Sequence, residues 1–270
     1  PPPAAPPPRE LAAKVDPLVR KLLSRLRVRS AAGLDGQVPV FYKGAVRVDT
    51  DERGRVVGHT NVLAPHLTSL FCMLLETGKT PAAWKASMLV PIFKKGSPSN
   101  PSDYRLIAIS SVLYRLYANV VRELIGDWAL AGGKVPHTQF GFIPGRDTMQ
   151  PLFILRHCAR LTKWRAATPR ASYLFVAFMD FSSAYDRVDR SKLWAHLRTI
   201  GCPSHLLAAV QGMYDGDSYI VVDGEKRTAP VPPLRGVRQG CPLSPLLFAL
   251  FLSDFDNEVG GEGVELLAPA

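Results

Sequence analysis

The sequence predicts an α+β fold in which helices and strands are mixed rather than strictly alternating. Apolar residues make up 47% of the 270 residues, which is enough for a sizeable core. Some segments carry apolar residues at helical spacing, whereas others are short apolar runs bounded by turns, as strands are. Asp223-Gly224 stands between two strand-like stretches, a pattern typical of a β-hairpin.

In the first half, the first eight residues include a run of prolines and should form an extended arm. The following residues 28–61 are rich in Gly, Asp and Arg, which indicates a loop with a short hairpin. A strand-like segment followed by a basic loop covers residues 86–101. Helical spacing predicts helices at 9–27 with an interruption at Pro17, at 62–78 with its end at Gly78, from Ser110 to about residue 130, and from 149 through Arg160.

The second half begins with a nearly uninterrupted apolar run, residues 172–181, which predicts a buried strand that ends on Asp180. Two helices should follow, at about 191–200 and 204–213. After the hairpin, a turn leads into a helix that ends in acidic residues.

Charge is distributed unevenly along the chain. The formal net charge is +10, with residues 1–171 at +14 and residues 172–270 at −4. A basic half joined to a mildly acidic half suggests that one region holds a polyanion and the other holds chemistry or a metal. An ordinary basic protein with solvated charges is the alternative interpretation.

Several classes of protein are disfavoured. The four cysteines lie far apart without a C-x-x-C pair, which argues against a zinc ribbon or a disulfide framework. The histidines have no metal-ligand spacing, no P-loop is present, and the longest apolar runs are too short for a membrane span. Because the chain begins with proline rather than a signal segment, we expect a soluble intracellular protein cut from a longer one.

Two segments are candidates for chemistry. FMDFSSAYDRVDR (178–190) places Asp180 at the end of an apolar run, and a tight turn could bring Tyr185 back over it. GVRQGCPLSPLLF (236–248) has glycines around Arg238-Gln239, which suits close contact between backbone and a base or sugar. Taken singly, the first is also compatible with a strand end before a capped helix, and the second with a simple loop-to-helix joint.

Together and in this order, these segments resemble the reverse transcriptase domain of non-LTR (LINE-type) retrotransposons, and more distantly group II intron reverse transcriptases. The resemblance covers about residues 62–258. Three further segments carry it: VPIFKKGSPSNPSDYRLIAISSVLYRLYANVV, similar to the fingers segment of the family; TQFGFIPGRDTMQPLFILR, similar to its Q-x-GF-x-x-GR-x-T element; and KLWAHLRTIGCPSHLLAAVQGMY, similar to the helical stretch after the first catalytic aspartate.

The resemblance implies the fingers and a partial palm of a right-hand polymerase, with the thumb absent. The expected regions are a Pro-rich arm and N-terminal extension (1–61), a fingers-like region (62–171) and a partial palm (172–270). It further implies RNA-directed DNA synthesis with an RNA template, a DNA primer, deoxynucleoside triphosphates and two Mg²⁺ ions, in a protein expected in the nucleus.

The resemblance also implies a role for individual residues. Asp180 matches the first catalytic, metal-binding carboxylate, and the Phe181 carbonyl is a second metal contact. Tyr185 matches the aromatic residue under the incoming sugar. The other matches are Gln239 and Gly240 beside the nascent base pair, Arg105, Lys94 and Lys95 near the triphosphate, and Arg146 and Arg238 near the template or other nucleic acid.

Two departures from the family pattern affect these expectations. Leu106 and Ala108 stand where the family usually has proline and serine. No Tyr-x-Asp-Asp motif follows the GVRQG segment, so we expect an incomplete metal site and little or no activity of this chain alone. Tyr214-Asp215-Gly216-Asp217 is interpreted as a surface turn, and neither it nor Asp254 and Asp256 is expected to bind metal.

Two alternatives therefore stay open: a non-catalytic remnant that binds nucleic acid, and an unrelated nucleic-acid-binding α+β module. If the resemblance holds, Asp180 and Gln239 should converge on one cleft.

Overall fold

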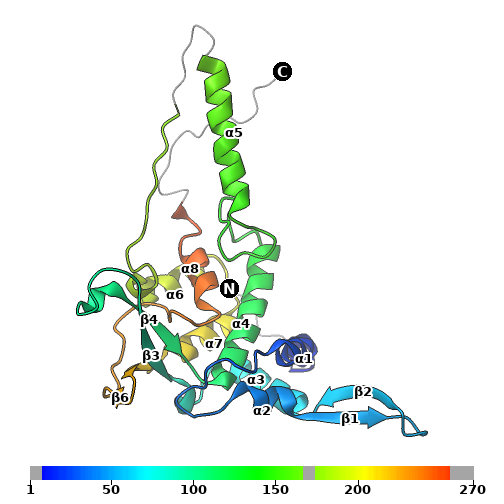
Figure 1. The fold of residues 1–270 in the computed structure, drawn as a ribbon. Coiled ribbons are helices and arrows are strands. Elements are labelled where there is room, and N and C mark those ends of the chain that lie inside the picture. Colours follow the sequence, from blue (N-terminus) through cyan, green and yellow to red (C-terminus); the bar gives the residue numbers. More distant parts are fainter. Residues whose placement is uncertain (1–7, 167–173, 256–270) are drawn as a thin grey trace.

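The computed structural model describes residues 8–166 and 174–255, which form helices packed around a small mixed sheet (Figure 1). The α+β class is therefore confirmed. The expected arm covered residues 1–8, of which 1–7 lie outside the described residues and Pro8 begins the first helix. The part of the predicted last helix beyond residue 255, including Asp256, also lies outside the described residues, and within them that helix ends at Phe251. The helices are α1 (Pro8–Arg25), α2 (Pro39–Gly44), α3 (Ala64–Thr77), α4 (Val112–Ala131), α5 (Met149–Ala166), α6 (Arg190–Thr199), α7 (Ser204–Tyr214) and α8 (Ser244–Phe251).

The strands form two separate sheets. The hairpin of β1 (Val46–Thr50) and β2 (Val56–Asn61) projects from one side of the molecule (Figure 1). The larger sheet has the order β4-β3-β5-β6 and comprises β3 (Ala86–Phe93), β4 (Tyr104–Ile109), β5 (Ser218–Asp223) and β6 (Lys226–Arg227). Its central strand β3 runs antiparallel to β4 and parallel to β5, so it joins segments more than a hundred residues apart in the chain.

Among the described residues, one hydrophobic core joins helices from the first and the second half of the chain. Helix α1 packs on α3 and α4, and α7 packs on the same two helices. The rings of Phe71, Trp84 and Tyr117 meet at its centre, with centroids 5.4 to 6.4 Å apart. Since these helices come from all three expected regions, the regions share a core and do not fold around separate ones.

Local signals placed most elements correctly. Helix α3 is followed by Gly78 in the left-handed conformation, as its position predicted. Ser111 caps α4 by accepting a hydrogen bond from the Tyr114 amide (3.2 Å). The hairpin at Asp223-Gly224 is confirmed, with Asp223 opposite Lys226.

The expected interruption at Pro17 was wrong, because α1 continues through it. Pro17 and Ala13, whose carbonyl the proline leaves without an amide partner, both lie on the exposed face, where water can satisfy that carbonyl. The opposite face buries Leu11, Val15, Val19 and Leu23, and this burial outweighs the proline.

The buried strand expected at 172–181 was also wrong for the residues that the structure describes. Residues 174–181 are irregular and unpaired, with Phe175 90% and Phe178 85% exposed. A strand requires a hydrogen-bonded neighbour, and no described strand lies against this segment. Asp180 is consequently exposed rather than buried.

Helix α5 stands out from the body of the molecule (Figure 1). It follows the turn-rich loop before Met149, as expected, but extends to Ala166. Among the described residues, no helix combines the length and the apolar character that a membrane span requires.

Candidate nucleotide-binding cleft

A cleft of about 690 Å³ lies between the β3–β4 pair, the segment 180–186 and the loop that precedes α8. Asp180 and Gln239 both line it, which is the convergence that the sequence predicted. The predicted residues in its wall are Lys94, Arg105, Asp180, Phe181, Tyr185 and Gln239. Tyr219, which the sequence did not indicate, lines it as well.

The walls of the cleft are joined by three backbone hydrogen bonds. The amide of Gly236 donates to the Val188 carbonyl, and the amide of Val237 donates to the Tyr185 carbonyl, both at 2.8 Å. On the other side of the loop, the amide of Ala108 on β4 donates to the Gln239 carbonyl at 2.7 Å. The loop 236–240, here called the Gln239 loop, is thus held between the turn at Tyr185 and strand β4.

This close approach explains the two glycines of the Gln239 loop. Gly236 has φ 92°, and a methyl group there would lie 3.0 Å from the Tyr185 carbonyl oxygen. Gly240 has φ 113°, and a methyl group there would lie 2.6 Å from the Ala108 carbonyl oxygen. Both conformation and space therefore require glycine at these positions.

Tyr185 is positioned by packing and by the turn that contains it. Its ring meets the Phe248 ring of α8 edge to face, with centroids 5.3 Å apart. Burial raises the pKa of its hydroxyl, so the side chain is neutral at physiological pH. The turn returns Tyr185 to the cleft that Asp180 lines, as the spacing of the two residues predicted.

The basic wall of the cleft comes from β3, β4 and the loop between them. The amide of Lys94 donates to the Asp103 carbonyl at 2.9 Å, and the Asp103 carboxylate accepts from the Ser97 amide at 2.9 Å. These bonds close the loop and place Lys94 and Arg105 in the cleft wall. Lys95 is exposed beside them, and Gly240 is exposed behind Gln239; neither lines the cleft.

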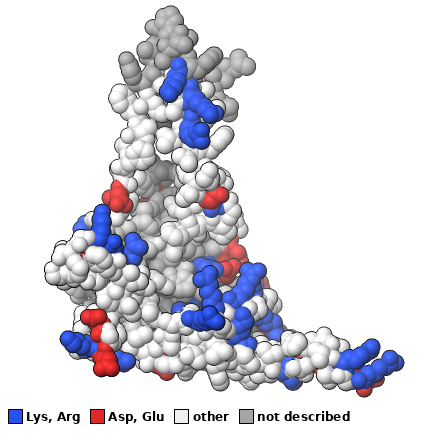
Figure 2. Space-filling view, viewed as in Figure 1, with Lys and Arg blue, Asp and Glu red and all other residues white. Residues whose placement is uncertain are grey.

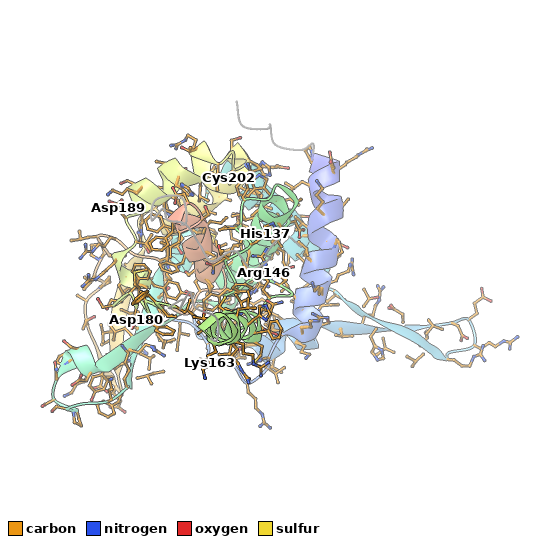
Figure 3. The ribbon with its side chains drawn as sticks, turned by 90° about the horizontal axis from the view of Figure 1, so that it is seen from above. His137, Arg146, Lys163, Asp180, Asp189 and Cys202 are labelled. Atoms are coloured by element: carbon orange, nitrogen blue, oxygen red, sulfur yellow. The ribbon has the colours of Figure 1, made fainter. Side chains whose placement is uncertain are left out.

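Arg146 lies away from Asp180 when the molecule is viewed from above (Figure 3). Its Nη1 donates to the carbonyl oxygens of Pro136 (2.6 Å) and Gln139 (2.8 Å), which closes the loop before α5. The side chain is only partly exposed, and its contact with a template stays a prediction.

The prediction that Arg238 contacts nucleic acid needs correction, because this side chain is fully buried. Its Nε lies 3.4 Å from Oδ2 of Asp217, and its guanidinium lies 4.6 Å from the centroid of the Tyr114 ring. Asp217 also binds Arg190 through both oxygens, at 2.7 and 2.9 Å. This cluster was not expected from the sequence: Asp217 occupied a segment interpreted as a surface turn, yet it is 4% exposed.

The cleft offers few ligands for a metal ion. Asp180 and Asp186 line it, but the described residues include no group of three or more His, Cys, Asp or Glu side chains that could hold a metal. Mg²⁺ in nucleotide sites is bound by one or two carboxylates together with phosphates and water. Asp180 fits as one such ligand, but the described residues do not make a complete two-metal site.

A family model described as reverse transcriptase (RNA-dependent DNA polymerase) matches residues 92–266. The chain belongs to the reverse transcriptase family. The match covers β4, the Tyr185 turn and the Gln239 loop, which form most of the cleft, whereas most of β3 precedes the matched range.

The relatives of this reverse transcriptase chain include proteins of non-LTR retrotransposons. The chain is 27% identical over 236 residues to the putative 115 kDa protein in type-1 retrotransposable element R1DM of Drosophila melanogaster. The alignment covers 85% of this chain and 20% of that protein. The chain is also 26% identical over 237 residues to the RNA-directed DNA polymerase from mobile element jockey of Drosophila melanogaster. That alignment covers 87% of this chain and 24% of that protein. The chain thus spans about a fifth to a quarter of the length of these curated relatives.

Proposed function

We propose that the cleft binds the incoming deoxynucleoside triphosphate of an RNA-directed DNA polymerase, which copies an RNA template onto a DNA primer. The observation that carries this proposal is the convergence of Asp180, Tyr185 and Gln239 with the basic side chains of Lys94 and Arg105 in one cleft. In the reverse transcriptase family, such a site joins the primer 3′-oxygen to the α-phosphate while the bond to the β-phosphate breaks and pyrophosphate leaves.

The cleft is chemically suited to such a ligand. Lys94 and Arg105 supply the positive charge that a triphosphate requires, and an arginine can grip phosphate oxygens with two hydrogen bonds. The half-buried ring of Tyr185 offers a flat apolar surface under a sugar, where it would crowd a 2′-hydroxyl. Gln239 supplies an amide beside the expected position of the base pair.

Asp180 would supply one carboxylate ligand to Mg²⁺, with the Phe181 carbonyl as a neighbouring ligand. Bound Mg²⁺ would neutralise phosphate charge and lower the pKa of the attacking hydroxyl. The remaining ligands are not among the described residues.

Basic side chains outside the cleft support a nucleic-acid partner. On the face shown in Figure 2, Lys and Arg side chains gather where α1, α2 and α4 lie. A template backbone is held by distributed positive charge of this kind, and such binding weakens as salt is added.

The direct test measures binding of a fluorescent dATP analogue to the chain with Mg²⁺ and an RNA template annealed to a DNA primer. We expect saturable binding that is weakened by Arg105→Ala and Asp180→Asn. Arg55→Ala, an exposed residue of the β1–β2 hairpin, is the matched control and should leave the affinity unchanged. Absence of saturable binding by the unaltered chain, or equal effects of Arg105→Ala and Arg55→Ala, would show the proposal to be wrong.

A second candidate function is non-catalytic nucleic-acid binding, which the incomplete set of metal ligands favours. It predicts salt-dependent binding of the primer–template that Asp180→Asn leaves unchanged, without binding of the dATP analogue and without primer extension. Incorporation of nucleotides that requires both Mg²⁺ and Asp180 would exclude this candidate.

A further inference from the structure

We propose that Asp217 is a positioning residue for the nucleotide site, because it fixes the Gln239 loop through the buried Arg238 and the partly buried Arg190. The ligand is a deoxynucleoside triphosphate, so this inference rests on the proposed function. None of Asp217, Arg190 and Arg238 lines the cleft, so they act on the ligand through the loop.

Asp217 is the shared anion of a buried cluster. Its side chain is 2% exposed, and the side chains of Arg190 and Arg238 are 15% and 0% exposed. Arg190 forms a two-pronged contact, with Nη1 on Oδ1 at 2.7 Å and Nη2 on Oδ2 at 2.9 Å. Such forked geometry fixes the direction of both side chains.

Each arginine attaches the cluster to a different part of the Gln239 loop. Arg190 Nε donates to the Gly236 carbonyl at 2.8 Å, at the start of the loop. Arg238 belongs to the loop and immediately precedes Gln239 in the sequence. Its Nη2 donates to the carbonyl oxygens of Lys85 (2.9 Å) and Met213 (3.2 Å). These bonds tie the loop to the start of β3 and to the last turn of α7.

The cluster is electrostatically dependent on Asp217. Arginine cannot lose its charge by deprotonation in a protein, so the buried guanidinium of Arg238 needs a counter-ion, and that of Arg190 is little hydrated without one. The Tyr114 and Tyr214 rings stack on Arg238, at 4.6 and 5.7 Å from its Cζ, but supply no full negative charge. Without the Asp217 carboxylate, the Arg238 guanidinium lowers its free energy by moving toward water, where it is hydrated, and Gln239 moves with it.

The test compares Asp217→Asn with Asp215→Asn in the same chain. Asp215 is a matched control, because it lies two residues away and pairs with Lys85 at 3.3 Å, but its side chain is 84% exposed. Three quantities are measured. They are amide hydrogen exchange of Val237 and Ala108, whose bonds hold the loop, affinity for the fluorescent dATP analogue with Mg²⁺ and primer–template, and affinity for the primer–template alone.

For Asp217→Asn we expect faster exchange at both amides and about tenfold weaker binding of the dATP analogue, which is the size of one lost hydrogen bond. Affinity for the primer–template alone should stay the same, which a general loss of folding would not allow. Asp215→Asn should leave all three quantities unchanged.

Arg190→Lys provides a milder variant if Asp217→Asn does not fold. A lysine cannot keep both the forked contact with Asp217 and the bond to the Gly236 carbonyl. We therefore expect the same faster exchange and weaker nucleotide binding, but smaller changes in both. Unchanged exchange at Val237 and Ala108 in a folded variant would overturn the proposal, as would faster exchange with unchanged nucleotide affinity. If the unaltered chain binds no nucleotide, the proposed function is wrong, and the exchange rates alone decide whether Asp217 positions the loop.

Discussion

Replacing Gly240 with alanine should release the Gln239 loop from strand β4. The added methyl group would lie 2.6 Å from the Ala108 carbonyl oxygen, which belongs to the backbone of a paired strand and cannot rotate away. The loop must therefore move, and the bond from the Ala108 amide to the Gln239 carbonyl is lost. A backbone conformation at φ 113° adds a cost of its own for any residue other than glycine.

The magnitude follows from these contributions. The unfavourable conformation costs about 1–3 kcal/mol, and the lost hydrogen bond costs about 1 kcal/mol. We therefore expect Gly240→Ala to lower the free energy of unfolding by about 2–4 kcal/mol. Urea unfolding followed by tryptophan fluorescence measures this change, because the midpoint shifts in proportion to the free energy.

Gly224→Ala is the matched control. Gly224 also has a positive φ, 59°, but a methyl group there would meet no atom within 4 Å. Its substitution should cost only the conformational part, about 1–2 kcal/mol, and the effect of alanine on the unfolded chain is the same in both variants. Equal losses at positions 240 and 224 would refute the close approach of the Gln239 loop to β4.

Three further predictions concern single side chains. Tyr117→Phe should raise the free energy of unfolding by about 1 kcal/mol, because its buried hydroxyl has no partner among the described residues; a lower urea midpoint would contradict this. Burial, and to a smaller extent Lys14, lower the pKa of His205 below 6.5, so the unfolded chain takes up the proton first and stability should fall as pH decreases below about 6.5. His205→Gln should flatten that slope, and thermal melts between pH 5 and 7 would show a persisting slope if another group causes it. Tyr185→Val should improve binding of a fluorescent ATP analogue relative to the dATP analogue, whereas an unchanged ratio would remove Tyr185 from the sugar site.

The sequence predicted the elements whose signals are local. A glycine after α3, a serine before α4 and the Asp223-Gly224 turn each act on their own neighbours, so their effects do not depend on the rest of the fold. Pro17 was misjudged because the cost of a proline is local, but the burial of the α1 face that outweighs it comes from α3 and α4. The prediction of a strand at residues 174–181 was wrong for the same reason, because β propensity alone cannot supply a neighbouring strand.

Residues of the candidate site could be predicted only where a short motif contains the residue type that the expected chemistry needs. Asp180, Tyr185 and Gln239 came from motifs, and the structure brings them to one cleft. Arg238 stood in the same motif but faces the interior, because Asp217, 21 residues earlier, provides its counter-ion. No local pattern connects an arginine to a carboxylate at such a distance, so the orientation of Arg238 could not be predicted from the loop.

The geometry also explains why the Gln239 loop combines glycines with an arginine. Backbone bonds to Val188, Tyr185 and Ala108 require the loop to lie against two other segments, and only glycines at both ends permit that approach. Glycines supply no side chain to hold the ends of the loop, and between them the buried Val237 is its apolar contact with the core. The buried Arg238 adds a polar anchor, and because its partner Asp217 leads directly into β5, the loop is tied to the sheet that carries Arg105 and is followed at the end of β3 by Lys94. The Gln239 loop and the basic wall of the cleft are therefore tied to one sheet through β3, β4 and β5, so these two walls are held relative to each other.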